Sequence, residues 1–345
     1  MRKRLESLVA EMEPQAQKAF FESIADLRAG ADLKALVEAL EARDIDAAIR
    51  ALNLEPSALR PFSRAIEQAY EGGGGITAEA VSDLFSRQGA KTVIRFDLTN
   101  PRAQAQISEF GLQKVAADVL PDMRQSARTI IEAGYLQGRG PKDIGRDLVG
   151  RVNRVTGRLE GGTVGLTNNQ TEYVLSMRQR LASGDPAKMR KVLAMKRRDK
   201  RFDRTIAKYI KEGKPVPQDM IDRMAGRYAD RLTQLRGEML ARTEVGQAVH
   251  RAKHESFKQG LEKTGYTEQA VTRRWRHSGL HGEDSRPQHI AMNNVTVKGM
   301  TQPFVMPDGT RMMHPLDMSL GAGANHIVGC RCDEEIDIDF SEGLD

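Results

Sequence analysis

The fold depends on residues 217–260, which read PQDMIDRMAGRYADRLTQLRGEMLARTEVGQAVHRAKHESFKQG. Apolar side chains recur there at steps of three and four, which predicts a single amphipathic helix of more than forty residues. The apolar stripe runs through Ile221, Met224, Tyr228, Leu232, Leu235 and Met239, and it resumes at Val245, Val249 and Ala252. Arg242 falls on the stripe between these two sets, so it needs an ionic partner or a path to water. We expect a structural ion pair with Glu238 or Glu244.

The whole chain predicts an α+β fold class, with a predominantly α-helical N-terminal and middle region and a small α+β module at the C-terminus. The expected divisions are an N-terminal helical region at 1–71, a glycine hinge with a short helix at 72–89, a long-helix region at 90–264, the α+β module at 265–340 and an acidic tail at 341–345. Two helix starts carry clear signals: Thr167 and Gln170 form a capping box, and Asp185 precedes Pro186.

Two breaks are expected inside the helical region. Glycine occupies all four positions from 72 to 75, and glycine has no side chain to pack and the largest backbone entropy. This run therefore predicts a flexible hinge, with Thr77 capping the helix that follows. The second break is at Pro121, because proline removes a helical hydrogen bond from the pattern at 103–135.

The positive charge of the chain is concentrated in residues 188–211. This basic segment has eleven lysines and arginines against Asp199 and Asp203, a formal charge of +9, whereas the whole chain carries +6. Such a segment is either a solvated surface or a site that binds the phosphate backbone of DNA without sequence specificity. The candidate DNA-binding residues are Arg190, Lys191, Lys196, Arg197, Arg198, Lys200, Arg201 and Arg204.

Composition narrows the cellular setting. A sequence pI near 9.3 favours an acidic partner such as nucleic acid. No apolar run approaches the roughly 20 residues of a membrane span, and no apolar core of a signal peptide follows the basic N-terminus. Cys330 and Cys332 are the only cysteines, so no disulfide framework is expected and synthesis in a reducing cytoplasm is indicated.

After residue 265 the hydrophobic period changes from helical to alternating. Val271, Arg273 and Trp275 predict a strand, and residues 336–340 predict a final edge strand. Between them we expect a short helix that carries His289, with Asp284 or Ser285 as its cap. These features predict the small α+β module.

Three chemistries fit the polar residues of this module. Zinc is the first, because imidazoles and thiols are its ligands, although Cys-x-Cys is not the usual zinc spacing; the available residues are His281, His289, His314, His326, Cys330 and Cys332. Hydrolysis or nuclease action is the second, with His289 as the base beside Asp284 and Arg286, but no nucleophile or metal-binding carboxylate set accompanies them. A structural role is the third, with Asp284 as a cap, Arg286 as a bridge, His289 bonded to backbone and both cysteines buried. We favour the structural role and expect no cofactor. If zinc does bind, the candidate ligands are His289, His326, Cys330 and Cys332.

The order of several motifs resembles the phage Mu protein F-like minor head proteins (phage head morphogenesis family). The resemblance covers about residues 90–335 and includes Phe96-Asp97, Gly165-Leu166-Thr167-x-x-Gln170, Arg201-Phe202-Asp203, Ala241-Arg242-Thr243-Glu244, Phe304 and Pro315-Leu316-Asp317. The motif residues of the C-terminal half are Arg242, Glu244, Trp275, Asp284, Arg286, His289, Cys330 and Cys332.

This resemblance implies a structural protein of a tailed bacteriophage without an established enzymatic activity. Such proteins are made in the host bacterial cytoplasm and lie in the virion, in the head interior or near the portal. Their expected partners are the portal protein, the major capsid protein and double-stranded phage DNA, during head morphogenesis and DNA packaging or ejection. The alternative function is a metal-dependent nuclease or toxin-like enzyme carried by the C-terminal module.

Overall fold

The structure is a computed structural model that describes residues 1–89, 93–279 and 285–342. Helices account for 64% of it, and the strands form a few small antiparallel sheets. The predicted mostly helical α+β fold class is therefore confirmed. Within the described ranges, no helix combines the length and the apolar character that crossing a membrane requires.

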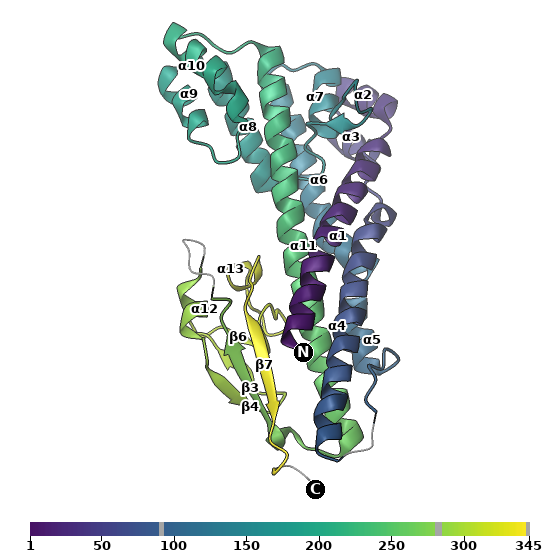
Figure 1. Cartoon of the computed structure of the whole chain (residues 1–345). Helices are drawn as coiled ribbons and strands as arrows, with labels where there is room; N and C mark the ends of the chain where they lie inside the picture. Colours follow the sequence, from purple (N-terminus) through teal and green to yellow (C-terminus); the bar gives the residue numbers. More distant parts are fainter. Residues whose placement is uncertain (90–92, 280–284, 343–345) are drawn as a thin grey trace. The chain divides into compact units, whose positions relative to one another are not determined.

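The chain folds into two compact units, each assembled from segments that are far apart in the sequence. Unit 1 consists of Met1–Lys18, Phe62–Gly111 and Glu238–Asp345, and unit 2 consists of Ala19–Pro61 and Leu112–Gly237. Two long helices, α1 (Arg2–Ala29) and α11 (Gln218–Thr264), contribute residues to both units (Figure 1). The predicted helix of more than forty residues is confirmed as α11, with 47 residues.

Unit 2 is a helical body with one very short β-ribbon. Its elements are α2 (Leu33–Glu41), α3 (Ile45–Ala51), η1 (Pro56–Leu59), α6 (Leu112–Leu136), α7 (Pro141–Val149), β1 (Arg151–Val152), β2 (Leu159–Glu160), α8 (Asn168–Ala182), α9 (Pro186–Leu193), η2 (Lys200–Phe202) and α10 (Asp203–Glu212). The capping box of Thr167 with Gln170 begins α8, and Asp185 caps α9, as predicted. Apolar residues of α8, α9 and α10 pack with the first part of α11 in one core.

Unit 1 combines most of α4 (Arg60–Arg87) with the sheets at the C-terminal end of the chain. Its other elements are α5 (Pro101–Ser108), η3 (Glu268–Ala270), β3 (Val271–Arg276), α12 (Pro287–Ala291), β4 (Thr296–Lys298), β5 (Phe304–Val305), β6 (Arg311–Met312), α13 (Ala324–Ile327) and β7 (Asp333–Ile338). The strands β4, β3 and β7 lie side by side in an antiparallel sheet with β3 in the centre (Figure 1). Val271, Arg273 and Trp275 alternate into the core, which confirms the predicted strand, and the final edge strand begins earlier than expected.

The glycines at 72–75 do not form a hinge. They lie inside α4, which is continuous, and Thr77 does not cap a helix but donates its hydroxyl to the carbonyl oxygen of Gly73 at 2.8 Å. A Cβ added at Gly73 would lie 3.1 Å from Cα of Val249 on α11, and a Cβ at Gly74 would lie 2.1 Å from the Phe96 ring. The glycines therefore allow close packing, and that packing outweighs their weak helix propensity.

The second expected break is also wrong, since α6 continues through Pro121. The ring of Pro121 is exposed, while Leu120 and Met123 beside it are buried. Burial of that apolar face compensates for the one hydrogen bond that proline removes. The break in this region lies instead at residues 109–111, between α5 and α6.

Alanine substitutions distinguish a packed helix from a hinge. We expect Gly74→Ala to destabilise the protein by about 1–3 kcal/mol, because the new methyl group overlaps Phe96. Gly75→Ala is the matched control: no atom lies within 4 Å of its added Cβ, so it should stabilise the helix by up to about 1 kcal/mol. Urea denaturation of both variants measures the difference, and equal effects of the two substitutions would contradict the packing.

Candidate functional site

The basic segment 188–211 is held by an apolar core on one side only. Met189 and Val192 of α9 and Ile206 of α10 are buried in the core of unit 2. Because these helices are amphipathic, their charged residues lie on the solvent side. Seven of the eight candidate DNA-binding residues are exposed, and only Arg198 is partly buried.

The two acidic residues of the segment pair with two of its arginines. Arg198 donates to both carboxylate oxygens of Asp203, at 2.9 and 2.8 Å, and Arg201 Nη2 lies 2.6 Å from Oδ2 of the buried Asp199. The hydrogen bond from Arg201 lowers the pKa of Asp199 to about 2. Within the described part of the chain, six candidates have no ion-pair partner; they are Arg190, Lys191, Lys196, Arg197, Lys200 and Arg204.

A cavity of about 560 Å³ lies next to this segment and is lined in part by Arg201 and Phe202. Sequence reasoning missed its other arginines, which come from α7, β1 and α11 and are exposed; they are Arg146, Arg151, Arg223 and Arg227. Beneath them, the buried Arg178 bridges Asp147 and Asp222 at 2.6 and 2.5 Å. These arginines are spread along the sequence, so no local charge run indicated them.

Three residues of unit 1 converge as a candidate metal-binding group. His289 of α12 lies with its Nδ1 atom 3.4 Å from Cys330 Sγ and 3.5 Å from Cys332 Sγ. All three side chains are buried, and their potential ligand atoms lie within 4.8 Å of one another. The structure thus brings together three of the four zinc candidates named from the sequence.

The fourth candidate, His326, contacts the other side of the His289 ring. His326 Nδ1 lies 3.3 Å from His289 Nε2, and the two rings stack with their centroids 5.5 Å apart. His326 Nε2 lies 2.8 Å from Asp308 Oδ2. Among the described residues, the His289 side chain is therefore bonded to a second histidine and not to backbone, which corrects the expected contact. Asp308 takes part in this network, and its sequence position did not reveal that.

The two thiols interact with each other and with Trp275. Two interactions hold the pKa of Cys330 well below its usual range. The larger is the hydrogen bond with the Cys332 thiol, and the smaller is the interaction with His289. The same pairing with Cys330, together with burial, raises the pKa of Cys332, whereas the Trp275 indole and the backbone N–H of Ser278 act in the opposite direction. Trp275 also packs edge-on against His289, with ring centroids 5.6 Å apart.

The other motif residues of the C-terminal half surround this group. Arg242 forms an ion pair with Glu13 of α1 at 3.9 Å, a partner that was not expected, and Glu244 is half-buried on α11. Arg286 is the N-cap of α12 in place of Asp284 or Ser285, and its Nη2 atom donates to the carbonyl oxygen of Val328 at 2.5 Å. Asp284 and His281 lie outside the described residues. The hydrogen bond from Arg286 to Val328 is the kind of bridge that was expected of this residue.

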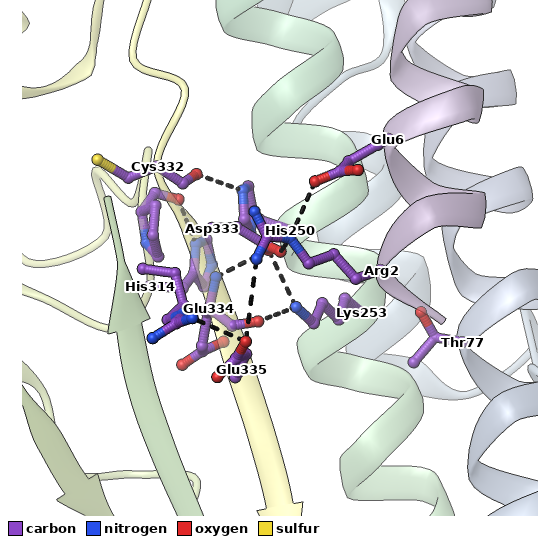
Figure 2. A network of polar contacts seen from close by, with 12 residues as sticks. Arg2, Glu6, Thr77, His250, Lys253, His314, Cys332, Asp333, Glu334 and Glu335 are labelled. Atoms are coloured by element: carbon purple, nitrogen blue, oxygen red, sulfur yellow. Dashed lines mark hydrogen bonds and ion pairs between the residues drawn. The ribbon is translucent and has the colours of Figure 1, made fainter. Parts of the chain in front are cut away.

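A second polar group lies where α11 contacts the sheet (Figure 2). Lys253 Nζ donates to Asp333 Oδ1 at 3.0 Å, and His250 Nε2 lies 3.2 Å from the carbonyl oxygen of Cys332 (Figure 2). His314, another of the six possible zinc ligands, stacks against His250 in this group, and among the described residues it is not part of the cluster of His289, Cys330 and Cys332. Burial lowers the pKa of His250 to about 3. These histidines are neutral members of the core.

Comparisons with protein-family models, curated proteins and solved structures gave no match to this chain.

Proposed function

We propose that this chain is a minor head protein of a tailed bacteriophage, located in the head interior or near the portal, and that its basic segment binds double-stranded DNA. The observation that carries the DNA contact is the set of six exposed cations without ion-pair partners among the described residues. Such cations are available to phosphates and release counterions when they bind. The resemblance of residues 90–335 to Mu F-like proteins supports the virion role, with the portal and major capsid proteins as partners.

The geometry supports contact with the phosphate backbone of DNA in preference to recognition of its bases. The segment presents lysines and arginines from two short helices and the turn between them, and Arg197 in that turn has a left-handed φ of 65°. The four exposed arginines of the cavity beside Arg201 are each paired with a carboxylate, so the cations of the basic segment that are unpaired among the described residues carry the proposed contact. Contacts of this kind place a protein on DNA but carry little sequence information.

Salt-dependent DNA binding tests the proposal. We expect the affinity of the purified chain for a random-sequence duplex to fall steeply with added sodium chloride, measured by fluorescence anisotropy. A fourfold variant should reduce the slope of log K against log salt by about 3 to 4, since each lost phosphate contact removes about 0.9; its substitutions are Arg190→Gln, Arg197→Gln, Lys200→Gln and Arg204→Gln.

The control variant removes three arginines and one lysine from exposed positions outside the segment. It consists of Lys3→Gln, Arg60→Gln, Arg64→Gln and Arg87→Gln, and it should leave the salt slope unchanged. An unchanged slope in the segment variant, or an equal loss in both, would contradict DNA contact by this segment. Mass spectrometry of finished particles tests the virion role, because an assembly factor would be absent from them.

A further inference from the structure

We infer that His289, Cys330 and Cys332 bind a zinc ion. The three donors come from two separate parts of unit 1: His289 lies on α12, and both cysteines lie between α13 and β7. In a tetrahedral site with Zn–N near 2.1 Å and Zn–S near 2.3 Å, nitrogen and sulfur ligands are about 3.6 Å apart. The two Nδ1–Sγ distances of 3.4 and 3.5 Å match that spacing.

The hydrogen bonds around His289 orient it as a metal ligand. The Asp308 carboxylate can only accept from His326 Nε2, so His326 Nδ1 is left to accept from His289 Nε2. This chain of contacts fixes the tautomer of His289 with its proton on Nε2. The lone pair on Nδ1 then faces the two sulfur atoms. A carboxylate–histidine connection of this kind is typical of the groups that support zinc ligands.

A backbone donor contacts one of the two sulfur atoms, and a buried indole lies in the same cluster. The backbone N–H of Cys332 donates to Cys330 Sγ at 3.4 Å. Trp275 Nε1 is buried and has no hydrogen-bond partner among the described residues, and Trp275 packs in the same core cluster as both cysteines. A backbone N–H directed at sulfur stabilises negative charge there. Two thiolates and one imidazole favour zinc over calcium or magnesium, which require oxygen ligands.

An apolar shell encloses the donors. Trp275, Phe304, Met306, Met312 and Ile327 pack in the same core cluster as both cysteines. The strands β5 and β6 nearby have only two residues each, so a metal that joins α12 to the segment before β7 would add a cross-link to a region with little regular structure. Three donors among the described residues leave one tetrahedral position for another ligand.

Metal content and thiol chemistry test this site on the full chain. We expect about one zinc ion per chain after purification and dialysis. Titration with an organomercurial should release that zinc as two thiols react, and because Cys330 and Cys332 are the only cysteines, this links the metal to them in the unaltered protein. Refolding with cobalt should produce thiolate-to-cobalt charge-transfer absorption. If wild-type protein refolded with zinc or cobalt binds neither, or if mercurial leaves the zinc bound, the site does not exist.

Variants separate the ligands from their supports. His289→Ala and the double variant Cys330→Ser/Cys332→Ser should lose the zinc, whereas His314→Ala should keep it, although it also removes a buried histidine of unit 1. Asp308→Asn should weaken zinc affinity by about 10- to 100-fold, as expected for a positioning residue. Full zinc content in folded His289→Ala, checked by circular dichroism, would overturn the assignment.

Discussion

Arg273→Met should lower the unfolding free energy by about 3–5 kcal/mol, because it leaves a buried carboxyl group without its cation. Arg273 and Glu334 are both fully buried, and Arg273 Nη1 lies 2.9 Å from Glu334 Oε1. The same guanidinium donates to the carbonyl oxygens of Gly299, Gln302 and Met313. Methionine fills similar space but satisfies none of these acceptors. Urea denaturation at pH 7 measures the loss.

The neighbouring Arg276 provides a control for this substitution. It lies on the same strand and pairs with Glu335 of β7 at 3.2 Å, but about a third of each side chain is exposed. Arg276→Met should therefore cost no more than about 1 kcal/mol. The double variant Arg273→Met/Glu334→Leu should recover part of the loss, since it removes the unpaired carboxyl as well. Equal costs at positions 273 and 276 would contradict the importance of burial.

Acid should destabilise the folded chain by several kcal/mol between pH 7 and pH 5. Burial lowers the pKa of His250, His254 and His314 from 6.5 in the unfolded chain, to about 3 for His250. Below pH 6.5 the unfolded state therefore binds protons that the folded state does not, and stability falls with pH. For one such histidine the loss at pH 5 is about 2 kcal/mol. Urea denaturation at several pH values measures the slope.

Glu334 acts in the opposite direction and makes a variant comparison necessary. Burial raises its pKa to about 7, so the folded state holds its proton more tightly and gains stability as pH falls through that value. The stability gained at Glu334 offsets about the loss from one histidine. The loss from the other two histidines remains. His254→Gln, whose amide oxygen can accept from Arg273 as His254 Nε2 does, should reduce the loss between pH 7 and pH 5 by about 2 kcal/mol. An unchanged slope would show that His254 becomes protonated in the folded state.

Local patterns in the sequence were sufficient to predict the longest helix and the starts of two others. The helical stripe that begins at Ile221 predicts α11, and the capping signals at Thr167 and Asp185 predict the starts of α8 and α9. The glycine run failed because its helical state depends on Val249 and Phe96, which are distant in the sequence. Helix propensity describes a residue in isolation, and tertiary packing overrode it at these positions.

For the candidate sites, too, the sequence identified some residues but not the contacts that only the fold creates. Residue type alone named His289, Cys330 and Cys332, but their spacing could not show that His289 reaches both sulfurs, since 40 intervening residues must fold first. Asp308 had no signal of its own because it follows Pro307 in a turn. Arg273 was recognised as an inward strand position, yet the partner that makes its burial tolerable, Glu334, lies on a strand 61 residues later.

The chain order of unit 1 has a consequence for synthesis on the ribosome. Its helix α1 is made before most of unit 2, whereas β7, which pairs along the whole of β3, is made after unit 2. Arg2 of α1 lies 3.8 Å from Asp333 of β7, so segments far apart in the sequence meet within unit 1. Vectorial folding can complete unit 2 once residue 237 has emerged. Unit 1 must wait for β7, and a nascent chain that stops before residue 333 leaves the charge of Arg273 without Glu334.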